Sequence, residues 1–242
     1  MLRRVVVFVV VMTTAPEKSS YDADSYAKVL PDRSVHQGSD RIFHRSGFVY
    51  DELVSCGAAQ LDGATLRVAA TLASGASVEL RVQVLDVTAL RIQLFHTGRD
   101  AAIEETSDML VAFAGDPGSL ELDEDERSIR LSFGSRLLVL QKNAASLRVL
   151  DSDTGRDCFE TEDYPLAGKP LVGALGFRCP PEGDPEPYLS WKIRNEERFF
   201  GLGEKWNKVE KSSTRSTVWA SDTCGSNSND LSYKSIPYLL SS

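Results

Sequence analysis

Three aspartates stand close together near the middle of the sequence, at Asp151, Asp153 and Asp157 in the stretch LDSDTGRD. Carboxylates at alternating positions of a short loop are the ligands that calcium-binding helix-loop-helix motifs use. Such a motif also needs flanking helices, a third early ligand and a glutamate at the end of the loop, and the sequence has none of these. Asp, Thr and Gly are moreover common turn residues. We therefore predict a hairpin turn here rather than a calcium site.

A pair of glycines, Gly201 and Gly203 in GLGEKW, has the spacing that begins a dinucleotide-binding loop. The third glycine of that motif would fall on Trp206, and the polar, β-branched stretch from Lys208 to Thr217 lacks the pattern of a helix. A phosphate-binding loop needs a strand before it and a helix N-terminus after it. We therefore predict that the two glycines are structural and mark a β-bulge or a close approach of two backbones.

The sequence offers no recognisable catalytic set. It contains no G-x-S-x-G nucleophile motif, and its histidines have no identifiable partners. The cysteines form no C-x-x-C pair, which argues against a zinc cluster and leaves the disulfide state open. Among 35 acidic residues, only Asp222 stands in a distinctive motif. We predict no catalytic residue, no metal ligand and no cofactor. The histidines and cysteines considered are His36, His44, His96, Cys56, Cys158, Cys179 and Cys224.

Charge and hydropathy limit the partners of the chain. The net charge of −8 and the lack of any Lys/Arg-rich block argue against a nucleic-acid partner. The apolar run from Val5 to Met12 is shorter than the about 20 residues of a membrane-spanning helix, so we expect no membrane partner. The run fits a signal-peptide core, a short first strand, or a true start at Met12, and residues 1–20 are left as a leader of undecided kind. We expect a cytoplasmic protein, with secretion as the alternative.

The elements that must position any site are β-strands. Apolar residues alternate with polar ones in SVELRVQVLD (77–86) and ALRIQLFH (89–96), and Asp86–Thr88 between them fits a hairpin turn. The same period continues in SIRLSFG, RLLVLQ and SLRVLD, with turn residues from Asn143 to Ala145. Turn signals at intervals of about 8–12 residues favour a sandwich or barrel. We predict an all-β protein, a large antiparallel β-sandwich.

Three stretches are expected to lie outside the strands. The acidic run ELDEDER (121–127) is predicted to be a solvated loop or turn. The proline-rich RCPPEGDPEPYLSW (178–191) is predicted to be an ordered surface loop. Residues 100–113 are expected to form at most a turn or two of helix, because they lack a sustained helical stripe.

The end of the chain carries three motifs in order. These are FFGLGE (199–204), WASD (219–222) and YKSIPY (233–238). They resemble, at suitable spacing, the N-terminal domain of glycoside hydrolase family 31, in which FYGLGE, a W-N-x-D turn and YK-x-IPF lead into the catalytic barrel. The family includes α-glucosidases, α-xylosidases and related lyases. ALRIQLF is similar to an earlier strand of that domain.

The resemblance implies a galactose-mutarotase-like sandwich, here residues 21–242, beside a (β/α)8 barrel. Both catalytic carboxylates of the family lie in the barrel, in a segment of the type DMNE and at a later aspartate. The chain contains no DMNE and ends at Ser242. We therefore expect a fragment of a retaining α-glycoside hydrolase that is not catalytic alone, because the retaining mechanism needs both carboxylates.

The resemblance also implies which residues contact substrate. Asp222 corresponds to an aspartate that hydrogen-bonds sugar hydroxyls, with Ser221 and Thr223 beside it and Trp219 as a stacking or core residue. Ala220 replaces the usual asparagine. Asp222 could instead be a simple turn residue. The partner is then an α-glucoside or α-xyloside, bound together with the barrel. A stand-alone carbohydrate-binding sandwich and an aldose epimerase, which needs a histidine and a glutamate, remain alternatives.

Overall fold

The computed structural model describes residues 8–10, 49–96, 116–163, 173–179, 185–194, 197–203, 209–211 and 239–241. The chain divides into two compact units, one of residues Val10–Lys192 and one of Met1–Val9 with Ile193–Ser242. Each unit is described by itself below. Within these ranges the regular elements are all strands, as predicted. The described residues include no long apolar helix of the kind that crosses a bilayer.

Fourteen strands are formed by the described residues. They are β1 (Phe8–Val10), β2 (Val49–Asp62), β3 (Thr65–Leu72), β4 (Ser77–Asp86), β5 (Ala89–His96), β6 (Leu120–Glu124), β7 (Ser128–Phe133), β8 (Arg136–Gln141), β9 (Leu147–Asp151), β10 (Asp157–Glu160), β11 (Leu175–Cys179), β12 (Glu186–Leu189), β13 (Phe199–Gly201) and β14 (Leu239–Ser241).

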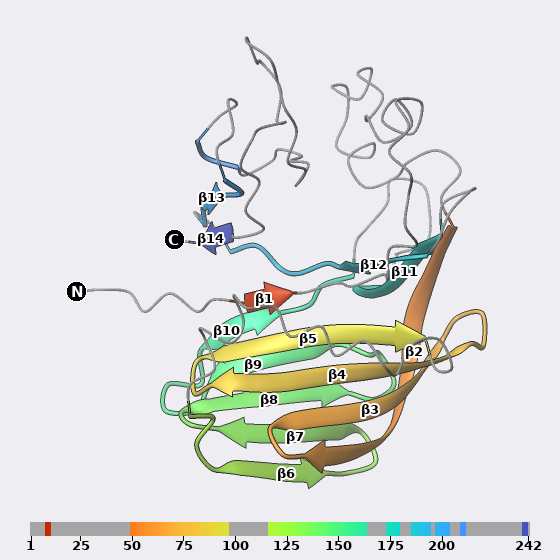
Figure 1. Cartoon of the computed structure of the whole chain (residues 1–242), viewed down its shortest axis with the longest axis horizontal. Coiled ribbons are helices and arrows are strands. Elements are labelled where there is room, and N and C mark those ends of the chain that lie inside the picture. Colours follow the sequence, from red (N-terminus) through yellow and green to blue (C-terminus); the bar gives the residue numbers. More distant parts are fainter. Residues whose placement is uncertain are drawn as a thin grey trace, which may run out of the picture. The chain divides into compact units, whose positions relative to one another are not determined.

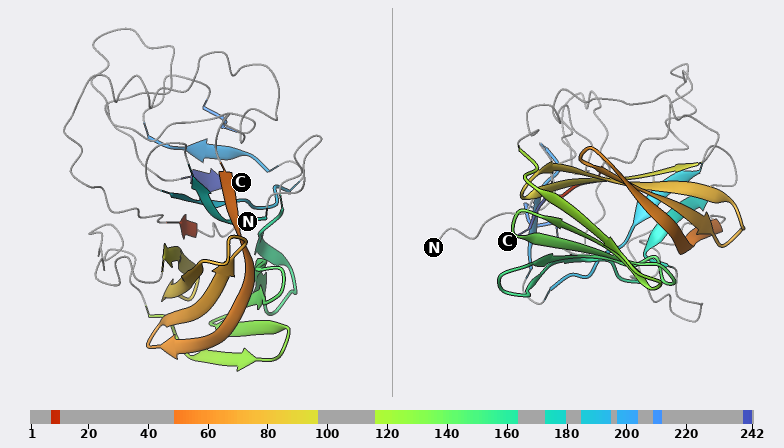
Figure 2. Two further views of the ribbon diagram at one scale, coloured as in Figure 1. Left: turned by 90° about the vertical axis from the view of Figure 1, so that its right-hand side faces the viewer. Right: turned by 90° about the horizontal axis from the view of Figure 1, so that it is seen from below.

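Strands β1–β12 form two sheets (Figure 1). A seven-stranded sheet has the order β1-β5-β4-β3-β2-β11-β12, and a five-stranded sheet has the order β10-β9-β8-β7-β6. Figure 2 shows the two as layers, with β3–β5 in orange to yellow and β6–β9 in green. The β9–β10, β11–β12, β3–β4 and β7–β8 pairs are antiparallel. The predicted antiparallel β-sandwich is confirmed.

Alternation of side chains along the strands builds the core. In β4, Val78, Leu80 and Val82 are fully buried, and the polar residues between them are half-buried. In β7, Leu131 and Phe133 are 0 % and 1 % exposed. Because successive side chains of a strand point to opposite faces, each sheet presents one apolar face to the other. The bounds of β4 and β5 coincide with the predicted strands.

The predicted hairpin turns are present and are closed by aspartates. Asp86 Oδ1 accepts hydrogen bonds from the backbone N and the Oγ1 of Thr88, both at 2.9 Å. Asp151 Oδ1 does the same for Thr154, at 3.0 and 2.9 Å, and Gly155 follows with a φ of +66°. The stretch with three aspartates is therefore a hairpin between β9 and β10, as predicted.

Irregularities in β2 connect the two sheets. The pairing of β2 with β3 shifts between Cys56 and Ala59, which frees two backbone N–H groups from the ladder. Cys56 N donates to Lys142 O at 2.8 Å, and Ala59 N donates to Glu124 Oε2 at 3.2 Å. Lys142 Nζ and Glu124 Oε1 lie 2.5 Å apart. The bulge thus turns backbone donors of one sheet toward acceptors of the other.

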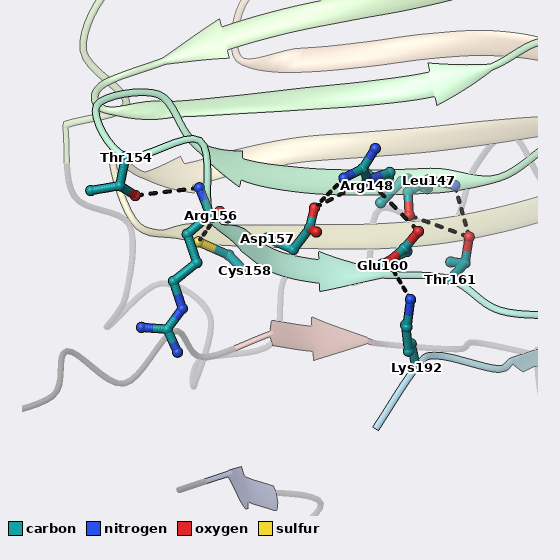
Figure 3. Close-up of polar contacts among 9 residues, drawn as sticks. All are labelled: Leu147, Arg148, Thr154, Arg156, Asp157, Cys158, Glu160, Thr161 and Lys192. Carbon is teal, nitrogen blue, oxygen red and sulfur yellow. Dashed lines mark hydrogen bonds and ion pairs between the residues drawn. The ribbon is translucent and has the colours of Figure 1, made fainter. Parts of the chain in front are cut away.

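A second connection forms where the chain leaves β12, and we call residues 160–162 with 190–192 the seam. Thr161 bridges Trp191, and Lys192 N donates to Glu160 O at 2.9 Å. The buried Thr161 Oγ1 accepts from Leu147 N at 2.8 Å, and Lys192 Nζ lies 3.3 Å from Glu160 Oε2 (Figure 3). The seam joins the end of one sheet to the edge strand of the other.

Two sequence predictions were wrong in part. The acidic run 121–127 is not all loop: its first half belongs to β6, and only Asp125–Arg127 form the turn. β6 is an edge strand with exposed acids, an arrangement that discourages pairing with another chain. The proline-rich stretch contains the end of β11 and the whole of β12, where Pro187 is tolerated because β12 is an edge strand. Residues 100–113 lie outside the described residues.

Candidate functional site

The predicted sugar-contacting residues Trp219, Ser221, Asp222 and Thr223 lie outside the described residues, within residues 212–238. The structure does describe both ends of this segment, at Lys211 and Leu239. Lys211 N donates to Phe199 O at 2.7 Å, on one side of β13. Leu239 is paired with Gly201 on the other side. The segment that carries Asp222 therefore begins and ends beside the same short strand.

We call β13, β14 and residues 209–211 the ribbon. β13 and β14 are antiparallel, with Phe200 opposite Leu240, and Phe200 also bridges Glu210. Phe199 is 6 % exposed and so anchors the strand by burial. Because both neighbours run antiparallel to β13, the segment starts beside Phe199 and returns beside Gly201, at opposite ends of the strand.

Glu197 fastens the start of the ribbon. Its Oε2 accepts from Arg194 N at 2.8 Å, while Glu197 N donates to Arg194 O at 3.1 Å. Its Oε1 accepts a hydrogen bond from Ser241 Oγ at the end of β14. One carboxylate thus ties the turn before β13 to the strand that closes the ribbon.

The GLG motif has an unusual backbone. Gly201, Leu202 and Gly203 have φ values of +118°, +68° and +84°. Glycine adopts positive φ freely, but a left-handed leucine costs about 1–2 kcal/mol. The sequence predicted a β-bulge or a close approach of two backbones at these glycines, whereas the structure shows a left-handed turn at the end of β13. The sequence prediction did not include Leu202; its position between two glycines that follow a strand was the available signal.

Other groups with chemical potential are used structurally. Burial raises the pKa of the Cys56 thiol to about 11, so it is protonated at neutral pH. His96 packs its ring on Phe177, with centroids 4.3 Å apart. His36, His44 and Cys224 lie outside the described residues. In the ranges that the structure covers, no group of three or more His, Cys, Asp or Glu could hold a metal ion.

Carboxylates cluster where β2, β11 and β12 meet, but they hold the backbone. Glu52 Oε2 accepts from Gly173 N at 2.7 Å, and Asp163 Oδ1 accepts from Ala174 N at 3.0 Å. Tyr50 and Tyr188 pack edge to face with ring centroids 5.4 Å apart. Burial raises the pKa of both phenols. The cluster therefore stabilises the sheet edge and leaves the ribbon as the candidate site.

Solved structures with a similar fold are much longer than this chain. The cycloalternan-forming enzyme of Listeria monocytogenes has a TM-score of 0.62 and 16% identity, over 80% of this chain and 17% of that one. The GH31 dextranase of Flavobacterium johnsoniae has a TM-score of 0.53 and 21% identity, over 78% of this chain and 21% of that one. At these identities the similarity concerns the fold. No curated protein matches the sequence.

A sequence match over more than half of the chain establishes its family. Residues 79–242 match the glycosyl hydrolase 31 N-terminal galactose mutarotase-like domain. The matched range includes most of β4 and all of β5–β14, and thus the five-stranded sheet, the seam and the ribbon. The chain therefore belongs to the family of glycosyl hydrolase 31 N-terminal galactose mutarotase-like domains.

Proposed function

We propose that these residues shape the substrate site of a retaining α-glycoside hydrolase of the α-glucosidase or α-xylosidase type, and that hydrolysis takes place in a separate catalytic barrel. The observation that carries this proposal is the attachment of both ends of residues 212–238 to β13. A chain segment whose two ends are both attached to one paired strand can hold a side chain at a defined place beside a substrate. Asp222, Ser221, Thr223 and Trp219 are the residues that this segment would present.

The chemistry of Asp222 suits a sugar. Its two carboxylate oxygens can accept hydrogen bonds from two neighbouring hydroxyl groups, and an ionised acceptor strengthens such bonds. Ser221 and Thr223 would add hydroxyl donors and acceptors. Trp219 would offer an apolar face to the sugar ring. None of these groups takes part in bond cleavage, which in the retaining mechanism needs a nucleophile and an acid/base carboxylate.

The dextranase of similar fold was solved in complex with isomaltotriose, a finding that supports the α-glucoside class here.

Turnover by the isolated chain tests the assignment of catalysis to another domain. We expect the purified 242-residue chain to hydrolyse neither p-nitrophenyl α-glucoside nor p-nitrophenyl α-xyloside. Activity that persists through repurification would contradict the proposal. Sugar binding by the isolated chain, at an affinity that a barrel does not increase, would favour the stand-alone binding module instead.

Asp222 provides the second test, in the enzyme that joins these residues to a catalytic barrel. We expect Asp222→Ala to lower kcat/KM by about 10- to 100-fold, the effect of losing charge-assisted hydrogen bonds. Asp153→Ala, at an exposed aspartate of the β9–β10 hairpin, is the matched control and should leave kcat/KM unchanged. Equal kinetics for both variants would reduce Asp222 to a turn residue.

A further inference from the structure

We propose that the ion pair between Glu124 and Lys142, which we call the latch, holds the bulge of β2 closed, and that the bulge can open locally while the rest of the sandwich stays folded. The bulge consists of residues 56–59. The proposal concerns a motion of the sandwich and does not rest on the proposed function.

The bulge has an interrupted ladder on one side. β2 pairs with β3 at Cys56 and again at Ala59, and the register shifts between them, so the register gives Gly57 and Ala58 no partner in β3. Both of these residues are exposed. Local opening is easiest where a ladder is broken and the backbone is open to water. The pairing with β3 alone therefore holds the bulge weakly.

The opposite side of the bulge is closed by residues at the ends of β6 and β8 rather than by a neighbouring strand. β11 pairs with β2 only over residues 49–52. Further along β2, Cys56 N donates to Lys142 O at 2.8 Å. Ala59 N donates to Glu124 Oε2 at 3.2 Å. These two hydrogen bonds take the place of the ladder that a strand would supply.

The latch connects the two hydrogen bonds. Lys142 Nζ lies 2.5 Å from Glu124 Oε1, and the two side chains are 15 % and 28 % exposed. A partly buried pair is screened less by water and salt than an exposed one. The backbone of Lys142 is held separately, because its N donates to Arg127 O at 2.8 Å. Loss of either charge should therefore loosen the Ala59 end of the bulge and leave the Cys56 end on one backbone hydrogen bond.

The Cys56 thiol reports whether the bulge is open. Cys56 is 7 % exposed, and burial raises the pKa of its thiol to about 11. In the closed form the thiol is therefore inaccessible and protonated at pH 8, and the opened form is the one that reacts with an alkylating reagent. The cysteine is used only as a probe of the motion.

Alkylation of Cys56 by iodoacetamide at pH 8, followed by mass spectrometry, measures the opening. We expect Glu124→Ala to raise the rate by about tenfold, because it removes both the ion pair and the acceptor of Ala59 N. Glu121→Ala, at another exposed acid of β6, is the matched control and should leave the rate unchanged. The experiment uses the 242-residue chain with its other cysteines replaced, as Cys158→Ser, Cys179→Ser and Cys224→Ser.

Two further variants separate opening from a change in the reactivity of the thiol. The Lys142 ammonium lowers the pKa of Cys56, so its removal would by itself slow alkylation, whereas removal of the Glu124 charge would not. We nevertheless expect both Lys142→Met and Glu124→Gln to speed alkylation, by about threefold, because each breaks the latch. The double variant should be no faster than the single variants, since they remove the same interaction.

Low concentrations of urea show whether the opening is local. Local opening exposes little surface, so the alkylation rate of Glu124→Ala should hardly change with urea. Leu66→Ala, a core variant of β3, provides the reference for global unfolding, and its rate should rise steeply with urea. A rate for Glu124→Ala that equals that of Glu121→Ala, or that rises with urea as for Leu66→Ala, would overturn the proposal, as would slower alkylation of Lys142→Met.

Discussion

The sandwich and the ribbon are stabilised by different means. Strands β2 and β4 of the sandwich are 14 and 10 residues long, whereas β13 and β14 are three residues each. The sandwich has a large set of side chains with no exposure, such as Leu80 and Leu131. The described ribbon buries Phe199 and Lys211 and leaves Val209 79 % exposed. Because few buried contacts mean low local stability, the comparison indicates that the sandwich supplies the stability and the ribbon supplies the candidate site.

The largest change in the free energy of unfolding is expected when core volume is removed from the sandwich. Phe133 is 1 % exposed, and we expect Phe133→Ala to lower the free energy of unfolding by about 3–5 kcal/mol, through lost burial and the cavity that remains. Val209→Ser in the ribbon should change it by less than about 0.5 kcal/mol, because Val209 is exposed. Urea unfolding of the chain measures both. Comparable losses would show that the ribbon shares the stabilising core.

A smaller loss of stability is expected when a glycine that has no room for a side chain is replaced in the sandwich. A Cβ built on Gly176 would lie 2.3 Å from Asp51 O and 2.9 Å from Glu52 Cα, on the backbone of the neighbouring strand. We expect Gly176→Ala to destabilise the chain by about 1–3 kcal/mol, because β2 and β11 must move apart.

The control for Gly176→Ala is Gly57→Ala, where the nearest atom is Ala69 O at 3.4 Å. We expect this change to be neutral or stabilising, since alanine restricts the unfolded chain. In the ribbon, Gly203 is limited by its φ of +84° rather than by space. Equal effects of Gly176→Ala and Gly57→Ala on the urea midpoint would show that the β2–β11 spacing is not tight.

The smallest expected effect concerns pH and a turn of the sandwich. Hydrogen bonds from the backbone N–H of Arg127 and of Ser128, each 2.7 Å, lower the pKa of Asp125 to about 2. A lowered pKa in the folded state means that the stabilisation is present above the ordinary value of 3.8 and is lost as the pH falls toward 2. Asp125→Asn should therefore be less stable than the wild type at pH 5, and the difference should shrink at pH 2.

Thermal unfolding at pH 5, 3 and 2 measures this difference. Asp153→Asn is the control, because Asp153 is an exposed aspartate of another hairpin turn of the same sandwich. A difference between the Asp125 variant and the wild type that stays constant from pH 5 to pH 2 would contradict the assignment.

Strands with a regular alternation of apolar and polar residues could be predicted from the sequence, and irregular strands could not. β4, β5, β7 and β8 alternate buried and less buried side chains along most of their length, so their bounds could be predicted from the sequence. β2 carries two register shifts, each of which breaks that period, and it was not predicted. In β6 the acids concealed the alternation of Leu120 and Leu122. The position of β11 beside β2 has no local signal at all.

The residues predicted to contact sugar came only from the resemblance, and they lie outside the described residues. Asp222, Ser221, Thr223 and Trp219 came from the motif WASD, since no pattern of charge or period distinguishes them from other polar residues. Physical reasoning on the glycines predicted a bulge or a close backbone approach, and it gave neither the left-handed turn nor the conformation of Leu202. A leucine in a left-handed conformation depends on contacts made after folding, and the sequence alone cannot show them.

The place of β11 has a consequence for the order of synthesis. The five-stranded sheet consists of consecutive hairpins, so each strand can pair as soon as the next one is made. β2 must wait for β11, and the hydrogen bond from Gly173 N to Glu52 joins residues 121 positions apart. Until then, β2 has an open edge during translation, and open edges promote pairing with other chains. Recombinant yield should therefore depend on how quickly β11 follows β2 out of the ribosome, and added chaperone should help the nascent chain more than the finished one.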